Sequence, residues 1–317
     1  MKAILQTDYG QPEVLKFADI DKPEIKDHEI LVRVRAAGLH AGDYFCLTGN
    51  PFLVRFVVGF PKPKNFVPGL DFAGEVEMVG KNVTKLKIDD KVFGSGKGAC
   101  AEYAGASQET VVKMPENLSF EQAAAVPTSA LAALHGLRDA GTVQAGQKVL
   151  INGASGGVGT FAVQIAKSFG AEVTGVCSSN HVEMVKAIGA DFVIDYTKED
   201  FTKSDTQYDL VLDNVANRSF SDIQRVLSPQ GKVLPNSGHA GLSYVIKASF
   251  RSMVNRQQGK PYVSSPNQKD LLVLKELLQS GKIKPVIDKT YTLDKTPEAL
   301  GYIGDGHAGG KVVITIP

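Results

Sequence analysis

The chain lacks three features that would each define a protein class at once: an excess of charge of one sign, a long apolar run and a set of paired cysteines. Its 317 residues include 35 Lys and Arg against 34 Asp and Glu, a formal net charge of +1. This balance provides no field to attract nucleic acid or an anionic membrane. An apolar stretch such as 51–60 is shorter than the roughly 18 residues of a membrane span, and it contains Arg55. We therefore expect no nucleic-acid partner and no membrane span.

The three cysteines, Cys46, Cys100 and Cys177, are odd in number and far apart in the sequence. That spacing indicates neither a disulfide framework nor a clustered metal site. The first ten residues lack the long apolar region and the cleavage site of a signal peptide. Hydrophobic residues make up 43% of the chain and charged residues 22%, which argues against disorder. We therefore expect a reduced, globular protein of the cytoplasm.

The length suggests roughly two domains of about 150 residues each, and the character of the sequence changes near residue 120. Before that point, short alternating runs at 29–38 and 74–80 are separated by Pro and Gly, which predicts an antiparallel β region. After it, apolar strands alternate with helical patterns, which predicts βαβ units and a parallel sheet. The expected fold class is α/β.

The clearest unit of the second region is a short strand at 148–153 that runs into a glycine-rich loop and then a helix ending near residue 169. The same alternation predicts strands at 172–177, 191–195, 208–213, 231–235 and 311–316, and helices at about 181–188 and 268–279.

The glycine-rich loop has the composition of a phosphate-binding turn. Dinucleotide phosphates need backbone N–H groups at a helix N-terminus, with no side chain in the way. Ala154, Gly156, Gly157 and Gly159 provide this between a strand and a helix, which is the required context. The loop therefore predicts cofactor binding, and the alternative is a turn whose glycines serve only close packing.

The residues after the second strand bear on which cofactor binds. An acidic residue about 20 positions after the glycines holds the adenosine ribose and marks NAD. Here the strand ends instead in Ser178, Ser179 and, after Asn180, His181. Two hydroxyls and a potentially cationic histidine could hydrogen-bond a 2′-phosphate, so the sequence favours NADPH. The alternative is that these are ordinary turn residues and helix caps.

Several motifs together resemble the medium-chain dehydrogenase/reductase superfamily, in its zinc-independent quinone oxidoreductase branch. The likeness covers essentially the whole chain. Its ending resembles the subgroup with the chloroplast envelope quinone oxidoreductase homologue and the 2-methylene-furan-3-one (enone) reductases. The motifs are VRAAGLHAGD (34–43), VPGLDFAGEVEMVGKNV (67–83), IDDKVFG (88–94), AAAVPTSALAALHGL (123–137), GTFAVQIAKSFGA (159–171), GADFVIDY (189–196) and DGHAGGKVVI (305–314).

The resemblance implies a two-domain organisation. A β-rich, GroES-like catalytic domain would span 1–122 and be completed by about 266–317, and a Rossmann NADPH-binding domain would span 123–265. It also implies a homodimer formed through the Rossmann domains, often by extension of the sheet across the two-fold axis.

The resemblance further bears on metal binding. Zinc-dependent alcohol dehydrogenases of this superfamily hold a catalytic metal with a Cys, a His next to a Glu, and a second Cys. The matching positions are His40, Leu70 with Asp71, and Thr128, and the cluster of four structural-zinc cysteines is missing. Leu70 and Thr128 do not suit a zinc site of N and S ligands. We therefore expect no metal, and simple alcohol oxidation is disfavoured.

The candidate catalytic residues are His40, Asp43 and Tyr44, for substrate orientation or proton donation. The quinone oxidoreductases usually have Asn at the position of His40, and the enone reductases have Lys at that of Phe45. His40 can still donate a hydrogen bond, whereas Phe45 cannot. His40 can equally be a structural histidine, and Tyr44 can equally serve packing.

Further cofactor contacts come from the resemblance alone. Gly157 and Val158 would meet the pyrophosphate, Ser178, Ser179 and His181 the 2′-phosphate, and Tyr196 the adenosine end. Asn236, Ser237, His307 and Ala308 would approach the nicotinamide half. Each also has a plain structural interpretation, such as a turn former for Asn236 or a loop residue for His307.

Without a metal, the accessible chemistry is hydride transfer from NADPH to an acceptor that is already electron-poor. The expected function is reduction of quinones or of the C=C bond of α,β-unsaturated carbonyls, with a small lipophilic enone or quinone as substrate. The alternatives are an NADPH-binding protein of low turnover and a zinc-type alcohol dehydrogenase with unusual ligands.

Overall fold

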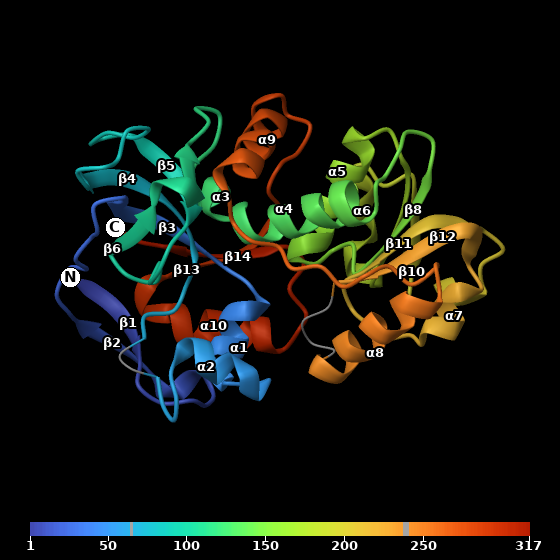
Figure 1. The fold of residues 1–317 in the computed structure, drawn as a ribbon, viewed down its shortest axis with the longest axis horizontal. Helices are drawn as coiled ribbons and strands as arrows, with labels where there is room; N and C mark the ends of the chain where they lie inside the picture. The colour runs from blue at the N-terminus through green and yellow to red at the C-terminus, as the bar shows by residue number, and fades with distance from the viewer. Residues whose placement is uncertain (64–65, 237–240) are drawn as a thin grey trace. The chain divides into compact units, whose positions relative to one another are not determined.

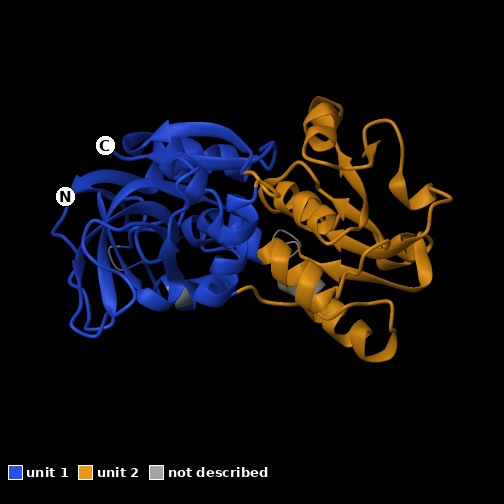
Figure 2. Ribbon diagram, turned by 90° about the horizontal axis from the view of Figure 1, so that it is seen from above, with its two compact units in different colours: residues 1–131, 265–280, 285–317 blue, residues 132–264, 281–284 orange. Residues whose placement is uncertain are grey.

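The computed structural model describes residues 1–63, 66–236 and 241–317 and divides into two compact units. Unit 1 comprises Met1–Leu131, Ser265–Ser280 and Pro285–Pro317, and unit 2 comprises Ala132–Ser264 and Gly281–Lys284 (Figure 2). The chain passes from unit 1 to unit 2 within helix α4 (Pro127–Leu134). The domain boundaries at 122/123 and 265/266 stay predictions. Residues 123–131 lie in unit 1, where α3 (Phe120–Ala124) packs on strands β3, β4, β5 and β14.

Unit 1 is built on a mixed sheet of seven strands among the described residues (Figure 1). The strand order is β13-β14-β3-β4-β5-β7, and β6 also pairs with β3. All neighbours are antiparallel except β13 and β14, which are parallel; the strands that come before residue 120 pair in the antiparallel manner predicted for that region. The strands are β3 (Glu29–Leu39), β4 (Asp71–Val79), β5 (Lys91–Ser95), β6 (Tyr103–Ser107), β7 (Val111–Lys113), β13 (Ile287–Thr292) and β14 (Lys311–Thr315), with a separate antiparallel pair of β1 (Lys2–Gln6) and β2 (Leu15–Asp19).

The helices of unit 1 lie against this sheet and against one another. Helix α1 packs on α10, and α9 packs on β7. Buried aliphatic side chains of β3, β4 and β14 join those of α10 in one core. Besides α3, the helices are α1 (Ala41–Thr48), α2 (Arg55–Val58), α9 (Gln268–Gln279) and α10 (Thr296–Gly304).

The described part of unit 2 contains a sheet of five parallel strands in the order β10-β9-β8-β11-β12. Helix α5 packs on β8 and β9, α6 on β9 and β10, and α7 on β12 (Figure 1). The strands are β8 (Lys148–Asn152), β9 (Glu172–Cys177), β10 (Phe192–Asp195), β11 (Tyr208–Asp213) and β12 (Leu227–Pro235), and the helices are α5 (Gly157–Ser168), α6 (Val182–Ala187), α7 (Phe220–Gln224) and α8 (Gly241–Val254).

Short turns of other helical types connect these elements. Tight 3₁₀ turns occupy Pro12–Val14, Phe52–Val54, Gln108–Thr110, Ser179–His181, Phe201–Lys203 and Leu293–Lys295, and a π-helical turn spans His135–Ala140. Among the described residues, no helix combines the length and the apolar character that crossing a membrane requires.

The periodic segments of the sequence form the elements that they predicted. Strands β8, β9, β11 and β14 and helices α5, α6 and α9 agree with the predicted ranges to within about two residues, and the α/β fold class with its parallel sheet is confirmed. The reason is local: β8 and β9 are continuous buried runs, and α5 buries one long face next to them. The sequence did not predict α8 or β13.

The order of the strands identifies the edge at which ligands bind in such sheets. From β8 the chain proceeds to β9 and β10 on one side and to β11 and β12 on the other. The direction therefore reverses between β8 and β11. Open α/β sheets bind their ligands outside the carboxyl ends of the strands at this reversal.

Candidate active site

The glycine-rich loop connects the carboxyl end of β8 to the first turn of α5. Gly153 has a φ of 77°, a left-handed conformation that glycine adopts without strain. A Cβ on Gly159 would lie 2.0 Å from the Gly153 carbonyl oxygen, so a side chain there would push the helix off the loop. A Cβ on Gly156 would have its nearest neighbour, the same oxygen, at 3.5 Å. Gly159 is therefore required by packing, whereas Gly156 is not.

The start of α5 suits the pyrophosphate of a dinucleotide. Its N-cap residue is Gly156, which has no side chain to cap the first turn. The N–H groups of such a turn point along the helix axis and, with the helix dipole, favour an anion. Gly156, Gly157, Val158 and Gly159 lie together at this position. Two N–H groups of the loop are already used within the protein: that of Ala154 donates to the Val176 carbonyl at 2.9 Å, and that of Gly156 donates to the Gly153 carbonyl at 3.2 Å.

The residues predicted for the 2′-phosphate lie where β9 ends. Ser178 is half-buried and Ser179 exposed, and His181 precedes α6. The Ser179 hydroxyl donates to Asp195 Oδ2 at 2.5 Å. Asp195 ends the neighbouring strand β10, and the exposed Tyr196 follows it. Asp195 was not among the predicted residues, because it ends the third strand of the region, whereas the acidic residue of NAD-binding proteins follows the second.

A chain of carboxamides lies at the carboxyl edge of β8, β11 and β12. Asn152 Nδ2 donates to Asp213 Oδ1 at 2.8 Å, and Asn214 Nδ2 donates to the Asn152 carbonyl at 3.0 Å. Asn236 Nδ2 donates to Asn214 Oδ1 at 2.7 Å. Of the two residues predicted here, Asn236 follows β12 and is linked through Asn214 to the reversal between β8 and β11, and Ser237 lies outside the described residues. Asn152 and Asp213 were not predicted, although their signal was available: each is a polar residue at the end of an apolar strand.

His40 and Asp43 belong to one capping arrangement at the start of α1 in unit 1. The His40 N–H donates to Asp43 Oδ2 at 2.9 Å, and His40 Nδ1 lies 3.4 Å from the same oxygen. Burial raises the pKa of the Asp43 carboxyl, and the nearby His40 opposes that shift. The other ring nitrogen, His40 Nε2, is buried and has no hydrogen-bond partner among the described residues. The ring is therefore held through Asp43 and keeps one polar atom for a ligand.

Two further buried polar groups accompany this histidine in unit 1. Asp71 accepts hydrogen bonds from the Thr128 N–H at 2.9 Å, the Thr128 hydroxyl at 2.7 Å and the Ser95 hydroxyl at 2.9 Å. Lys311 donates to the Leu39 carbonyl at 2.7 Å and to the Ser129 hydroxyl at 3.0 Å. Burial lowers the pKa of Lys311, and the Asp71 and Asp43 carboxylates oppose the shift.

Tyr44, His307 and Ala308 also lie in unit 1. Tyr44 packs against the core, its ring lies against Gly304, and its hydroxyl donates to Gln11 Oε1 at 3.3 Å. His307 is exposed, and its Nδ1 contacts the Asp305 carbonyl. Ala308 is half-buried beside the core. The structure thus gives Tyr44 and Ala308 packing contacts, and the ligand-binding roles of all three stay predictions.

The positions that would hold a catalytic zinc do not fit that metal. Leu70 has no ligand atom and is 39% exposed, and Thr128 directs its hydroxyl to Asp71. The Asp71 carboxylate is in turn engaged by Thr128 and Ser95. Of these four positions, only His40 has a ligand atom without a hydrogen-bond partner in the described part of the chain, namely its Nε2. Among the described residues, no group of three or more His, Cys, Asp or Glu side chains could hold a metal ion.

An exposed aromatic cluster lies near α2 in unit 1. Phe52, Phe56 and Phe60 are each more than half exposed, and their ring centroids lie 5.7–6.0 Å apart. The Arg55 guanidinium lies over the rings of Phe52 and Tyr9. The three phenyl rings thus form an exposed apolar surface rather than part of the core.

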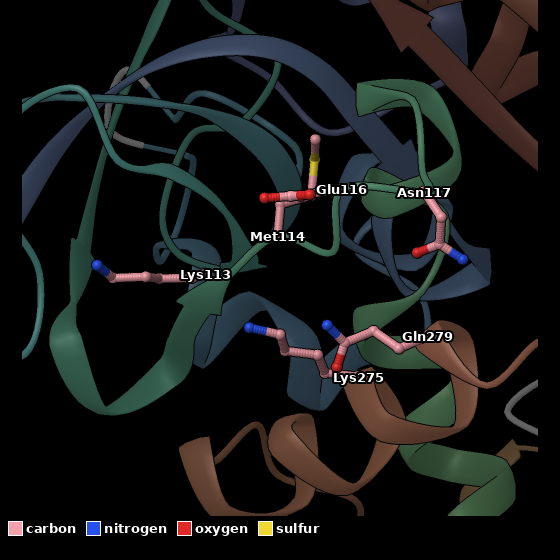
Figure 3. Close-up of a pocket in the computed structure, with 6 residues that line it drawn as sticks. All are labelled: Lys113, Met114, Glu116, Asn117, Lys275 and Gln279. Atoms are coloured by element: carbon pink, nitrogen blue, oxygen red, sulfur yellow. The ribbon is translucent and has the colours of Figure 1, made fainter.

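A hollow of about 440 Å³ lies elsewhere in unit 1 (Figure 3). Two of its polar side chains are already paired: Lys113 with Asp90 at 3.0 Å, and Asn117 with the Leu278 carbonyl at 3.1 Å. It contains none of the predicted site residues. Its lining is Lys113, Met114, Glu116, Asn117, Lys275 and Gln279.

Comparison with known proteins agrees with this architecture. Residues 26–116 match the family model of the alcohol dehydrogenase GroES-like domain, and residues 188–314 match that of the zinc-binding dehydrogenases. The chain is 35% identical over 329 residues to the 2-methylene-furan-3-one reductase of Solanum lycopersicum, covering 99% of this chain and 79% of that protein. It is 32% identical over 329 residues to the chloroplastic NADPH-dependent alkenal/one oxidoreductase of Arabidopsis thaliana, with the same coverage.

A solved structure extends the likeness to the whole fold. The quinone oxidoreductase of Coxiella burnetii superposes with a TM-score of 0.90 at 32% sequence identity, covering 100% of this chain and 99% of that one. With a GroES-like unit, a five-stranded parallel unit and relatives above 30% identity over nearly the whole chain, the protein belongs to the medium-chain dehydrogenase/reductase superfamily, alongside quinone oxidoreductases and enone reductases.

Proposed function

We propose that this protein is an oxidoreductase that uses NADPH to reduce quinones or the C=C bond of α,β-unsaturated carbonyl compounds, without zinc. The names of its relatives support this reaction class. The observation that carries the proposal is the donor set around Asp71. A metal would polarise an ordinary carbonyl, but Leu70 offers no ligand atom and Asp71 already accepts three hydrogen bonds from Thr128 and Ser95. The acceptor must therefore be reactive without a metal, as an enone or a quinone is.

The bound NADPH would supply the hydride, and the chain would bind and orient the reactants. The first turn of α5 would hold the pyrophosphate. In unit 1, Asp43 fixes the His40 ring, and the buried His40 Nε2 is available to the oxygen of an acceptor. When both ring nitrogens carry a proton, with Nδ1 facing Asp43, a hydrogen bond from Nε2 would stabilise negative charge as it develops on the oxygen. The phenyl rings of Phe52, Phe56 and Phe60 suit a lipophilic acceptor.

The first test is the rate of NADPH oxidation, against NADH, with a short enone, a long-chain enone and a 1,4-quinone as acceptors. His40→Ala should lower kcat by about a hundredfold, the scale of a lost general acid or oxyanion donor. His28→Ala, at an exposed histidine of the same unit, is the matched control. Tight NADPH binding without turnover of any acceptor would instead support a binding protein. Stoichiometric zinc in the purified, active protein would contradict the metal-free proposal.

A homodimer formed through unit 2 is also part of the proposal. The outer edge of β12 is partly occupied within the chain itself: the Val233 N–H donates to the Gln257 carbonyl, and the Gly259 N–H donates to the Val233 carbonyl. Extension of the sheet would therefore start from the segment around 257–264, where Val263 is 89% exposed. Light scattering coupled to gel filtration would give the mass. The cytoplasmic location stays a prediction, and some relatives carry names that place them in chloroplasts.

A further inference from the structure

The ends of strands β9 and β10 form a polar corner that contains more than the predicted residues. The two strands are parallel, with Asp195 in register with Cys177. The Tyr196 N–H donates to the Cys177 carbonyl at 3.0 Å, which holds the two strand ends together. As a result, the residues after Cys177 and those after Asp195 face the same edge of the sheet.

Asp195 is the centre of this corner, and its hydrogen-bonding capacity is full. Oδ1 accepts from the Thr197 N–H at 3.0 Å and the Thr197 hydroxyl at 2.7 Å. Oδ2 accepts from the Ser179 hydroxyl at 2.5 Å and lies 3.0 Å from Lys198 Nζ. These bonds, chiefly those of the Ser179 and Thr197 hydroxyls, hold the pKa of the Asp195 carboxyl well below its usual value. A carboxylate accepts about four hydrogen bonds, so none remains for a ribose hydroxyl.

This arrangement changes what each side chain can do for a cofactor. Ser179 was predicted to donate to a 2′-phosphate, but its proton is directed to Asp195. An ionised Asp195 without its partner would repel a phosphate at this corner. Lys198 is different: its ammonium has three N–H groups, only part of which Asp195 uses, and its side chain is 73% exposed. It can therefore contact a phosphate without leaving the carboxylate.

We propose that Lys198 is the residue that selects NADPH over NADH, by pairing with the 2′-phosphate while Asp195 holds it in place. The proposal rests on the proposed function in one respect only, namely that unit 2 binds a nicotinamide dinucleotide. Lys198 neutralises the charge of Asp195. It also has free N–H donors for a phosphate, whereas the hydroxyl protons of Ser179 and Thr197 are already donated to Asp195. Two other basic groups of this region are placed differently, since Lys186 pairs with Glu183 within α6 rather than with the carboxylate at the centre of the corner, and His181 is half-buried.

Calorimetric titration of the 317-residue protein tests this directly, with NADP⁺ and NAD⁺ and with the fragments adenosine 2′,5′-bisphosphate and 5′-AMP. Lys198→Met should weaken binding of both 2′-phosphorylated ligands by about tenfold, as expected for one lost charge-assisted hydrogen bond. Binding of NAD⁺ and 5′-AMP should change by less than about twofold. Lys186→Met, which removes the same charge from another paired lysine of unit 2, should leave all four affinities unchanged.

The substitution Asp195→Asn should have the opposite effect on the affinity for NADP⁺. It removes the negative charge and keeps Lys198, so NADP⁺ should bind more tightly while NAD⁺ binding changes little. The inference is overturned if Lys198→Met leaves NADP⁺ affinity unchanged, or if it weakens NADP⁺ and NAD⁺ equally. If the wild-type protein binds neither dinucleotide, the proposed function fails as well. If it binds NADP⁺ and the Lys198 variant binds it equally well, the function stands and only the role of Lys198 is lost.

Discussion

Lys311 is a buried cation within an otherwise apolar strand, and its surroundings explain why it is tolerated. The side chain is 1% exposed and donates to the Leu39 carbonyl and the Ser129 hydroxyl. The Asp71 and Asp43 carboxylates oppose the lowering of its pKa by burial. At the scale of single residues, unit 1 is thus organised around a few buried charges whose partners are contributed by distant parts of the chain.

Lys311→Met should destabilise the protein by about 3 kcal/mol, because it leaves buried carboxylates without their counter-charge and an acceptor without its donor. Denaturant unfolding measures the change. Lys289→Met on the neighbouring strand β13 is the control, since Lys289 is exposed, and it should have little effect. Equal stability of the two variants would contradict the role of Lys311.

The raised pKa of the Asp43 carboxyl predicts that the stability of the protein depends on pH. Because burial raises the pKa of this carboxyl above the usual 3.8, the folded state binds this proton more tightly than the unfolded state. The resulting stabilisation is complete below 3.8 and is lost as the pH rises through the raised value. Relative to Asp43→Asn, the wild-type protein should therefore lose free energy of unfolding between acidic and neutral pH. Parallel curves for the two proteins would contradict this assignment.

At the scale of elements, the loop between β8 and α5 contains two glycines with different roles, one in packing and one in leaving the first turn of the helix open to a ligand. Gly159 is required because a Cβ would meet the Gly153 carbonyl oxygen at 2.0 Å, whereas Gly156 has room for one. A strand that runs into a helix can bind phosphate only if its turn is both tightly packed and open at the first N–H groups. The two requirements can be separated by substitution.

Gly156→Ala should fold with little change in unfolding temperature but bind NADP⁺ at least about tenfold more weakly, because a methyl group obstructs the approach of the pyrophosphate. Gly159→Ala should instead lower the unfolding temperature, since the helix must shift. Thermal unfolding and calorimetry distinguish the two effects. Unimpaired NADP⁺ binding by a folded Gly156→Ala protein would argue against this loop as the phosphate site.

At the scale of the whole molecule, the chain returns to its starting unit to complete a sheet. Strand β14 lies between β13 and β3, so residues near the C-terminus pair with a strand that begins at Glu29. Val312, Val313 and Ile314 are almost fully buried there, and Ile316 follows them into the core. Unit 1 is therefore complete only when the end of the chain is in place.

Removal of residues 311–317 should prevent unit 1 from folding. Four buried aliphatic side chains contribute at least about 6 kcal/mol, which is comparable to the whole stability of a typical protein. Limited proteolysis should show rapid cleavage in unit 1, whereas deletion of the exposed Pro317 alone should change nothing. A truncated chain with the wild-type pattern of protection would contradict the central place of β14.

Much of the fold could be predicted from the sequence, because its determinants are local. Continuous apolar runs produced β8, β9 and β11, and the 3.6-residue pattern that begins after Gly156 produced α5. The glycine spacing likewise indicated the tight turn between β8 and α5, and phosphate binding by that turn stays a prediction. In contrast, α8 and the parallel pairing of β13 with β14 were not predicted, since pairing direction depends on the path of the chain in space.

The sequence by itself therefore determined the strongly periodic elements, their order and the loop between β8 and α5. Only the tertiary structure decided how the polar side chains are used. Ser179 and Asp195 are 16 residues apart in the sequence, and parallel pairing of their strands brings the hydroxyl and the carboxylate into contact. Lys311 meets the Leu39 carbonyl across 272 residues. Hydrogen bonds act over about 3 Å, so which donor is left for a ligand depends on neighbours that the fold, and not the local sequence, supplies.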